Sequence, residues 1–489
     1  MTTIPRVVVS APSSGHGKTA VSLGLLAALA SRGLRCAGFK IGPDHIDAAY
    51  LGLASGRPGR NLDPRLVGGH RVGPLFAHGA IGADIAVVEG TMGLYDGLTG
   101  RTDVESTAQV AGVLRAPVVF VVDVAAMGQS VAALVHGFRA YDEVVWLGGV
   151  ILNRVGSDRH EQLLREALDD IGVPVFGALR RGALVPAGPG AVPARTHGPV
   201  PVVHHSLEAV RAVRRLGEVV HDTVDVDRVL SLAQSAPPLA TEPWSPAAEL
   251  GMVDHAGPRP VVAVAGGPSS GYGYAETSEL LRAAGAEVVP LDPLRDESLP
   301  AGTAALVLGG GLPESYAEEL AANERLSRQV ADLARAGQPV IAEGVGLVWL
   351  SRELDGRPMC GVLDTAARVT DLLVIGYREA TAQTSSPLAA AGARLVGYKH
   401  HRTQVLPRAG VSPAWAWPGG QPEGFVWRGV HASFLNLHWA GAPEIAVRLV
   451  AAARQTAIPA PVPVSPAVPP AIPAPAPAHD EPATEALEL

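Results

Sequence analysis

The chain of 489 residues is poor in cysteine, with only Cys36 and Cys360, and neither lies in a Cys-x-x-Cys pair or near a cluster of histidines. This scarcity argues against a disulfide framework and against a structural zinc site. We expect each cysteine to be a small, buried, hydrophobic residue on a strand.

Clustered basic residues and long apolar runs are also missing. Lys and Arg are scattered along a chain whose net charge is -8, so nucleic acid is not an expected partner. No apolar run is long enough to span a bilayer, and the first residues, MTTIPR, lead into a strand-like run without a signal-peptide h-region. No membrane partner is therefore expected, and a cytoplasmic location is predicted.

Apolar residues are plentiful, at 47% of the chain, and they form short runs that alternate with helical patterns. Such alternation predicts a doubly wound, mostly parallel α/β sheet, with ligands at the carboxyl ends of its strands. In the first half, the predicted strands cover residues 6–10, 35–40, 85–89, 117–122, 147–153 and 173–179.

Composition shifts divide the chain. A stretch rich in Pro, Ala and Ser precedes a second α/β pattern, which includes a strand at 339–342 and helices over 316–336 and 347–354. The C-terminal Pro/Ala repetition cannot bury a core and is expected to be disordered. The predicted parts are a first domain over 1–232, a linker over 233–258, a second domain over 259–455 and a tail over 456–489.

The stretch RVVVSAPSSGHGKT, residues 6–19, has the order of strand, Gly-rich loop and helix start that a phosphate-binding loop needs. Backbone N–H groups at the helix start favour an anion, Lys18 adds a positive charge, and the Thr19 hydroxyl can ligate Mg²⁺. The match is incomplete, because Pro12 stands where the full G-x-x-x-x-G-K-[ST] motif has glycine. The predicted nucleotide-binding residues of the loop are Ser14, Gly15, Gly17, Lys18 and Thr19.

Acidic residues follow two other predicted strands. Asp44 and Asp47 come just after Lys40, and Glu89 ends the strand at 85–89. A single acid there is compatible with a solvated loop residue, but three at one sheet edge favour a site that holds Mg²⁺ or orients a substrate. Asn153 closes a further strand and fits either contact with an adenine ring or plain turn chemistry.

Between residues 7 and 178, a nearly continuous run of motifs resembles the amidotransferase family of cobyrinic acid a,c-diamide synthases and its hydrogenobyrinic acid counterpart. The motifs that carry the resemblance are APSSGHGKT, FKIGPDHIDAAY, GRNLD, VVEGTMGLYDG, ESTAQVA, PVVFVVD and GVILNRVGSDRH. The resemblance implies a carbon–nitrogen ligase of cobalamin biosynthesis that uses ATP and Mg²⁺. ATP would phosphorylate the a and c carboxylates of a corrinoid, and ammonia would then displace the phosphate.

The resemblance also implies roles for individual residues. Lys18, Thr19 and the loop amides would bind the phosphates, and Lys40 would balance charge on the transferring phosphoryl group. The acids assigned to Mg²⁺ and to the reacting carboxylate are Asp44, Asp47 and Glu89. The family's later Arg-His-Leu-Gly run is present only in altered form, as RTHG at 195–198.

The second half departs from the family, whose members carry a glutaminase of the Cys-His type. In the family, the nucleophile lies in a tight turn between a strand and a helix, the elbow, with the sequence Ala-Glu-Cys-Gly-Gly. The same turn reads AEGVG at 342–346 here, so Gly344 takes the place of the nucleophile. Asn436 takes the place of the catalytic histidine. His438, two residues further on, would point the same way if this segment were a strand, but it has no nucleophile to activate. Cys360 lies well past the elbow and is not expected to replace the thiol.

The first half therefore predicts an amide ligase that uses free ammonia or a separate glutaminase, with a glutaminase domain that is inactive. A non-catalytic paralogue that binds a corrinoid or a nucleotide is the alternative hypothesis. A partition-type ATPase would need a lysine where Ser13 stands. A homodimer is compatible with all of these interpretations.

Overall fold

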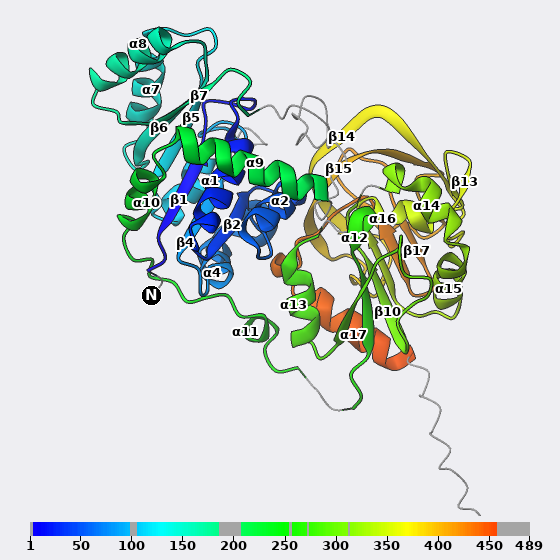
Figure 1. Ribbon diagram of the computed structural model, residues 1–489. Helices are drawn as coiled ribbons and strands as arrows, with labels where there is room; N and C mark the ends of the chain where they lie inside the picture. The colour runs from blue at the N-terminus through cyan, green and yellow to red at the C-terminus, as the bar shows by residue number, and fades with distance from the viewer. Residues whose placement is uncertain are drawn as a thin grey trace, which may run out of the picture. The chain divides into compact units, whose positions relative to one another are not determined.

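The computed structural model describes residues 3–97, 105–184, 207–253, 257–270, 273–311 and 313–456 (Figure 1). The run at 195–198 and the predicted Pro/Ala-rich tail, apart from its first residue, Thr456, lie outside these residues. The described residues belong to one structural unit, so contacts between its sheets are part of one fold. The domain boundaries drawn from the sequence stay a prediction.

The first sheet has seven strands, all parallel, in the order β3-β2-β4-β1-β5-β6-β7. The predicted doubly wound sheet is confirmed, but the sequence did not reveal β3, whose three residues are too few to form a pattern. The connections reverse direction around β1, which places the Gly-rich loop that follows β1 at the switch point of the sheet. The strands are β1 (Arg6–Ser10), β2 (Cys36–Ile41), β3 (Arg60–Leu62), β4 (Ile85–Glu89), β5 (Val118–Asp123), β6 (Leu147–Val155) and β7 (Val175–Arg180).

Helices cover both faces of this sheet, because alternate strand residues face opposite sides. Val7 and Val9 belong to one buried cluster and Val8 to another. Figure 1 shows α9 lying along α1 on the first of these faces. The helices on that face are α1 (Lys18–Ser31), α2 (His45–Ser55), α9 (Leu207–Thr223) and α10 (Val226–Gln234). Those on the other face are α3 (Pro64–Val67), α4 (Gly69–Gly79), α6 (Thr107–Val113), α7 (Ser130–Tyr141) and α8 (Asp158–Asp169).

The second sheet has six strands in the order β17-β18-β11-β10-β8-β9, of which β17 is antiparallel. Its strands are β8 (Val261–Ala265), β9 (Glu287–Leu291), β10 (Thr303–Leu308), β11 (Val340–Glu343), β17 (Phe425–Trp427) and β18 (Val430–Ser433). Its longer helices are α13 (Ala275–Ala283), α14 (Ala317–Ala322), α15 (Glu324–Arg335), α16 (Gly346–Leu350) and α17 (Glu444–Thr456). The buried cluster that contains Val8 continues into α13 and α17, so the two sheets share a core.

Two helices of the second half differ from the sequence prediction. The helix predicted over 316–336 is two helices, because Asn323 breaks it and its side chain caps the start of α15. The helical run predicted over 347–354 ends at Leu350. The chain then turns into β12 (Glu353–Leu354) and β13 (Arg357–Pro358).

A long hairpin of β14 (Ala366–Ala382) and β15 (Arg394–Leu406) dominates the third sheet, to which β12, β13 and β16 (Trp415–Ala416) also belong (Figure 1). Three short helices complete the second half: α12 (Gly267–Ser270), η1 (Pro313–Ser315) and η2 (Trp439–Gly441).

Part of the predicted linker packs on the first half. Trp244 is buried, its backbone N–H donates to Pro74 O, and its ring meets His78 of α4 edge-on. The short helix α11 (Pro246–Leu250) follows. Among the described residues, no helix combines the length and the apolar character needed to cross a membrane.

Candidate functional site

The Gly-rich loop has the backbone that the sequence predicts. Gly15 and Gly17 have φ of 90° and 101°, a left-handed region that favours glycine. Gly17 also lies against Asn153, whose Nδ2 would be 2.6 Å from a Cβ at position 17. Ser14 and Gly15 lie exposed at the tip of the loop, and α1 begins at Lys18. The loop therefore presents backbone N–H groups at a helix start, as a phosphate site requires.

Lys18 is buried at this helix start, and its ammonium donates to Ser13 O at 2.9 Å. Burial, with the nearby charge of Lys40 as a second cause, lowers the pKa of Lys18 to about 8. A phosphate at the loop would bring negative charge to this ammonium and favour its protonated form.

A compact polar cluster lies beside the loop where β1, β2 and β4 end. Thr19 Oγ1 donates to Glu89 Oε1 at 2.5 Å. The Lys40 ammonium lies 2.7 Å from Glu89 Oε1 and 2.8 Å from Asp47 Oδ2, and it also donates to Gly90 O at 3.0 Å. Lys40 and Glu89 are direct neighbours in the register of β2 and β4. The structure thus brings together four of the residues that the sequence singled out.

Asp44 is placed differently from the other acids. Its Oδ1 accepts from the N–H groups of Ile46 and Asp47, so it caps the N-terminus of α2. Asn61 of β3 donates to the carbonyls of Gly42 and Asp44 and fixes the turn that leads into this cap.

The predicted Mg²⁺ site fits only part of its expected ligand set. Within the described ranges, no group of three or more His, Cys, Asp or Glu residues is arranged to hold a metal ion. Asp47 is held by Lys40, and Asp44 by its helix cap. Glu89 Oε2, in contrast, is buried without a hydrogen-bond partner among the described residues, next to the Thr19 hydroxyl. A hydroxyl and a carboxylate oxygen beside a phosphate loop are hard ligands of the kind that Mg²⁺ takes.

Asn153 contacts the main chain of the Gly-rich loop. Its Nδ2 donates to His16 O at 2.8 Å, and its Oδ1 accepts from the N–H of Arg154. The side chain therefore supports the phosphate loop, and contact with an adenine ring stays a prediction.

The second half contains an elbow whose two key positions face each other. Gly344 lies in the turn between β11 and α16 with φ of 56°, and a Cβ there would be 2.3 Å from Asn436 Oδ1. Asn436 is buried, and its Nδ2 donates to Tyr398 O at 3.0 Å. Neither a glycine nor an asparagine side chain acts as a nucleophile or as a general base at neutral pH, and the assignment of these two positions to the nucleophile and the base of a glutaminase stays a prediction.

Other side chains near the elbow do not replace the missing groups. Burial raises the pKa of Glu343 to about 8, and Trp439 Nε1 lies 3.3 Å from its carboxyl oxygens. The strand β18 ends at Ser433, so the condition under which His438 would point the same way as Asn436 is not met. The ring of His438 stacks on Tyr274. Cys360 is buried in the core of the second half, and burial raises its pKa to about 12.

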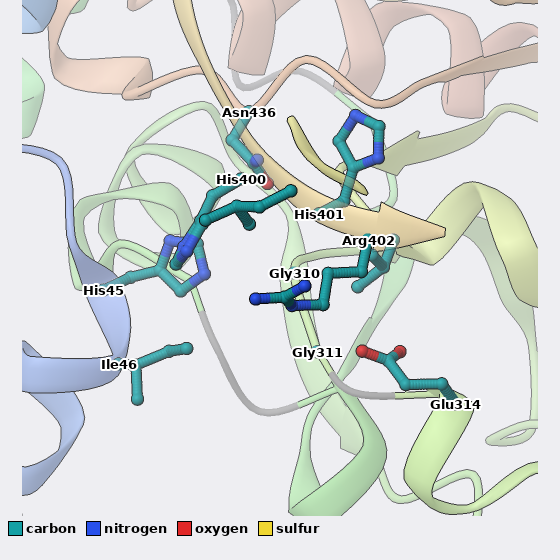
Figure 2. Close-up of a pocket in the computed structure, with 11 residues that line it drawn as sticks. His45, Ile46, Gly310, Gly311, Glu314, His400, His401, Arg402 and Asn436 are labelled. Atoms are coloured by element: carbon teal, nitrogen blue, oxygen red, sulfur yellow. The ribbon is translucent and has the colours of Figure 1, made fainter. Parts of the chain in front are cut away.

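Two hollows adjoin the elbow. The larger, of about 640 Å³, is lined by residues of α2 together with Glu343 and Asn436. Figure 2 shows the smaller one, with the rings of His45 and His400 on one side, Glu314 on the other and Arg402 reaching between them. Burial lowers the pKa of His45 to about 4, so this imidazole is neutral at neutral pH.

A phosphate loop at the switch point of a parallel sheet, followed by an α/β half with an elbow, defines a phosphate-loop NTPase-like domain joined to a class I glutamine amidotransferase-like domain. Residues 7–190 match the family model described as "CobQ/CobB/MinD/ParA nucleotide binding domain". Residues 271–443 match the model described as "CobB/CobQ-like glutamine amidotransferase domain". The predicted fold class is therefore confirmed for both halves.

Comparison with curated proteins identifies the family. Over 476 residues the chain is 53% identical to "Hydrogenobyrinate a,c-diamide synthase" of Streptomyces coelicolor, covering 91% of this chain and 97% of that protein. It is 48% identical over 456 residues to the protein of the same name in Mycobacterium bovis, with 92% and 98% covered. It is 35% identical over 478 residues to "Cobyrinate a,c-diamide synthase" of Synechococcus sp., again with 92% and 98% covered. The chain belongs to the family of cobyrinate and hydrogenobyrinate a,c-diamide synthases.

Sequence reasoning missed the residues that join the two halves near the site. The signal for Asp63 was present, because an aspartate directly before a proline is a typical helix start, and Asp63 indeed caps α3. Its partner lies far away in the sequence, as do those of the other linking residues, so no local pattern marks them. The missed residues are Arg60, Asp63, Tyr274, Glu276 and Tyr377.

Proposed function

We propose that the protein amidates the a and c carboxylates of cobyrinic or hydrogenobyrinic acid in cobalamin biosynthesis, with ATP as the activating substrate. The observation that carries this proposal is the cluster of Thr19, Lys40 and Glu89 beside a phosphate loop, in a chain that belongs to this family. ATP would convert each carboxylate into an acyl phosphate, and ammonia would displace the phosphate.

Each residue of the cluster has a role in this proposal. Lys18 and the loop N–H groups bind the phosphates, while Thr19 and Glu89 hold Mg²⁺, which supplies positive charge near the transferred phosphoryl group. Lys40 balances the charges of Glu89 and Asp47 and keeps both carboxylates in place. Asp44 contributes through the cap that orients the first turn of α2, where Asp47 lies.

The source of ammonia is the second part of the proposal. Gly344 and Asn436 leave the elbow without a nucleophile and without a base. We therefore expect the enzyme to use ammonia from solution or from a separate glutaminase. A homodimer and a cytoplasmic location stay predictions.

The test is an amidation assay with ATP, Mg²⁺ and the corrinoid diacid, in which ammonium and glutamine are compared as nitrogen sources. We expect diamide with ammonium and no more with glutamine than without a nitrogen source. Lys18→Ala is the matched negative control, because it removes the charge at the loop and leaves the elbow intact. Equal activity with glutamine alone would refute the proposed nitrogen source.

The non-catalytic alternative makes a different prediction in the same assay. It rests on the predicted loss of glutaminase activity at the elbow, and it predicts that the protein binds nucleotide or corrinoid without turnover. ATP hydrolysis that depends on the corrinoid would contradict this alternative. Absence of any corrinoid-dependent ATP turnover with ammonium would contradict the ligase proposal instead.

A further inference from the structure

Buried polar contacts tie the second half to the strand edge where the cluster lies. Arg60 of β3 is buried, and its guanidinium lies 2.6 Å from Glu276 Oε1 and 2.5 Å from Glu279 Oε1, both on α13. Glu276 is fully buried. A buried ion pair of this kind tolerates little displacement, because separation leaves a charge without a partner. The start of α13 is therefore held in place against β3.

Tyr274, the residue just before α13, reaches from this anchor into the first half. It is buried, its ring stacks on His438 with centroids 4.1 Å apart, and it meets His45 edge-on. With the ring fixed in this way, its hydroxyl donates to Pro43 O at 3.1 Å.

Pro43 lies in the turn between the two members of an ion pair. Lys40 precedes this turn on β2, and Asp47 follows it in the first turn of α2, with 2.8 Å between the ammonium and Oδ2. The carbonyls of Gly42 and Asp44 are both held by Asn61 of the same half. The Pro43 carbonyl between them is held by a side chain of the second half, that of Tyr274.

A second contact of the same type lies next to the first. Tyr377 of β14 donates its hydroxyl to Asp63 Oδ2 at 2.7 Å, while Asp63 Oδ1 caps α3. Arg65 of α3 lies over the Tyr377 ring and pairs with Glu105. Both tyrosines thus hold segments that directly follow strands of the first sheet.

We propose that the second half, without glutaminase chemistry, holds the phosphoryl-transfer site in its active geometry. In this proposal Tyr274 is the positioning residue that fixes the turn at 42–44. The effect that we expect on kcat rests on the proposed function, whereas the effect that we expect on hydrogen exchange in this turn does not. Loss of the Tyr274 hydroxyl frees the Pro43 carbonyl and loosens the geometry of Lys40 and Asp47.

The experiment compares Tyr274→Phe with wild type by hydrogen–deuterium exchange and by steady-state kinetics. The phenylalanine keeps the ring and its stacking, so it removes one hydrogen bond and leaves the fold. We expect faster amide exchange in residues 42–50 and unchanged exchange in the phosphate loop at 13–19. We expect kcat for ammonium-dependent amidation to fall about five- to tenfold, as loss of one hydrogen bond implies, with an unchanged KM for ATP.

Tyr316→Phe is the matched control, because Tyr316 lies in the same half and its hydroxyl makes no hydrogen bond to any residue that the structure describes. It should change neither exchange nor kcat. Tyr377→Phe is the second test variant, and it should speed exchange at 63–67 rather than at 42–50.

The outcomes separate this inference from the proposed function. If wild type makes no diamide, the proposed function fails, while the exchange data still decide whether Tyr274 fixes the turn at 42–44. Unchanged exchange at 42–50 in Tyr274→Phe overturns the inference, and so does a lowered melting temperature with unchanged exchange and kcat. An equal loss of kcat in Tyr316→Phe overturns it as well.

Discussion

Gly344 and Asn436 should be energetically coupled, because the side chain of Asn436 occupies the space that a Cβ at position 344 would need. In Gly344→Ala, the left-handed backbone at φ of 56° costs a non-glycine residue about 1–2 kcal/mol. The new Cβ would also lie 2.3 Å from Asn436 Oδ1, which forces that side chain to move. Loss of its hydrogen bond to Tyr398 O adds about 0.5–1.5 kcal/mol. We expect a total destabilisation of about 2–3 kcal/mol.

In an Asn436→Ala background, only the backbone cost of Gly344→Ala remains, since the overlapping atoms are gone. The coupling energy of the double-mutant cycle should therefore be about 0.5–1.5 kcal/mol, the contribution of the lost hydrogen bond. Tyr398 O keeps a partner in that background, because the backbone N–H of Asn436 also donates to it. Urea unfolding followed by tryptophan fluorescence measures all four proteins. Equal costs of Gly344→Ala in both backgrounds would refute the assignment of the two positions as facing partners.

The same geometry predicts that Gly344→Cys alone releases no ammonia from glutamine. A thiol at this position meets an amide, which is no general base at neutral pH. Ammonia release by wild type or by this single variant would contradict the assignment.

Three further predictions follow from charge and burial. Above about pH 8 the affinity for ATP should fall, because Lys18 then loses the proton that attracts phosphate, and Lys18→Ala should remove this pH dependence in binding titrations from pH 6.5 to 9.5. The native state keeps the Glu343 proton up to about pH 8, whereas the unfolded chain loses it near 4.5, so between these values the native state binds more protons and stability falls as pH rises. Glu343→Gln should make the melting temperature depend less on pH over this range. An unchanged slope of melting temperature against pH would contradict a buried, protonated carboxyl. Lys40→Met leaves Asp47 and Glu89 buried without their cation and should destabilise the protein by about 3–5 kcal/mol in urea unfolding.

The sequence was sufficient for the elements whose signal is local. Apolar runs located six strands of the first sheet, and the loop motif located Lys18 and Thr19, since strand, loop and helix start are adjacent in the chain. The three residues of β3 carry no such pattern. The break at Asn323 was missed because the apolar spacing continues on both sides of it.

The arrangement of the cluster depends on strand order, which the sequence does not encode locally. Lys40 and Glu89 meet because β2 and β4 are neighbours in register, although 49 residues separate them. The sequence suggested that Lys40 balances charge on the transferring phosphoryl group. In the structure, however, two carboxylates lie around its ammonium. Tyr274 and Pro43 are 231 residues apart, and Tyr377 and Asp63 are 314 apart. Such contacts are visible only after both halves have folded.

The elbow is well packed, although the proposed function gives it no glutaminase chemistry. Glycine adopts the φ of 56° at Gly344 without strain, and the side chain of Asn436 lies directly beside it with its own hydrogen bond satisfied. Trp439 lies against the neighbouring Glu343 and keeps the turn buried. This well-packed elbow lies between β11 and α16, and the same half presents Tyr274 to Pro43. The predicted absence of a nucleophile is therefore compatible with the intact packing of the second half, because the contacts that it makes with the first half require its shape and not its catalysis.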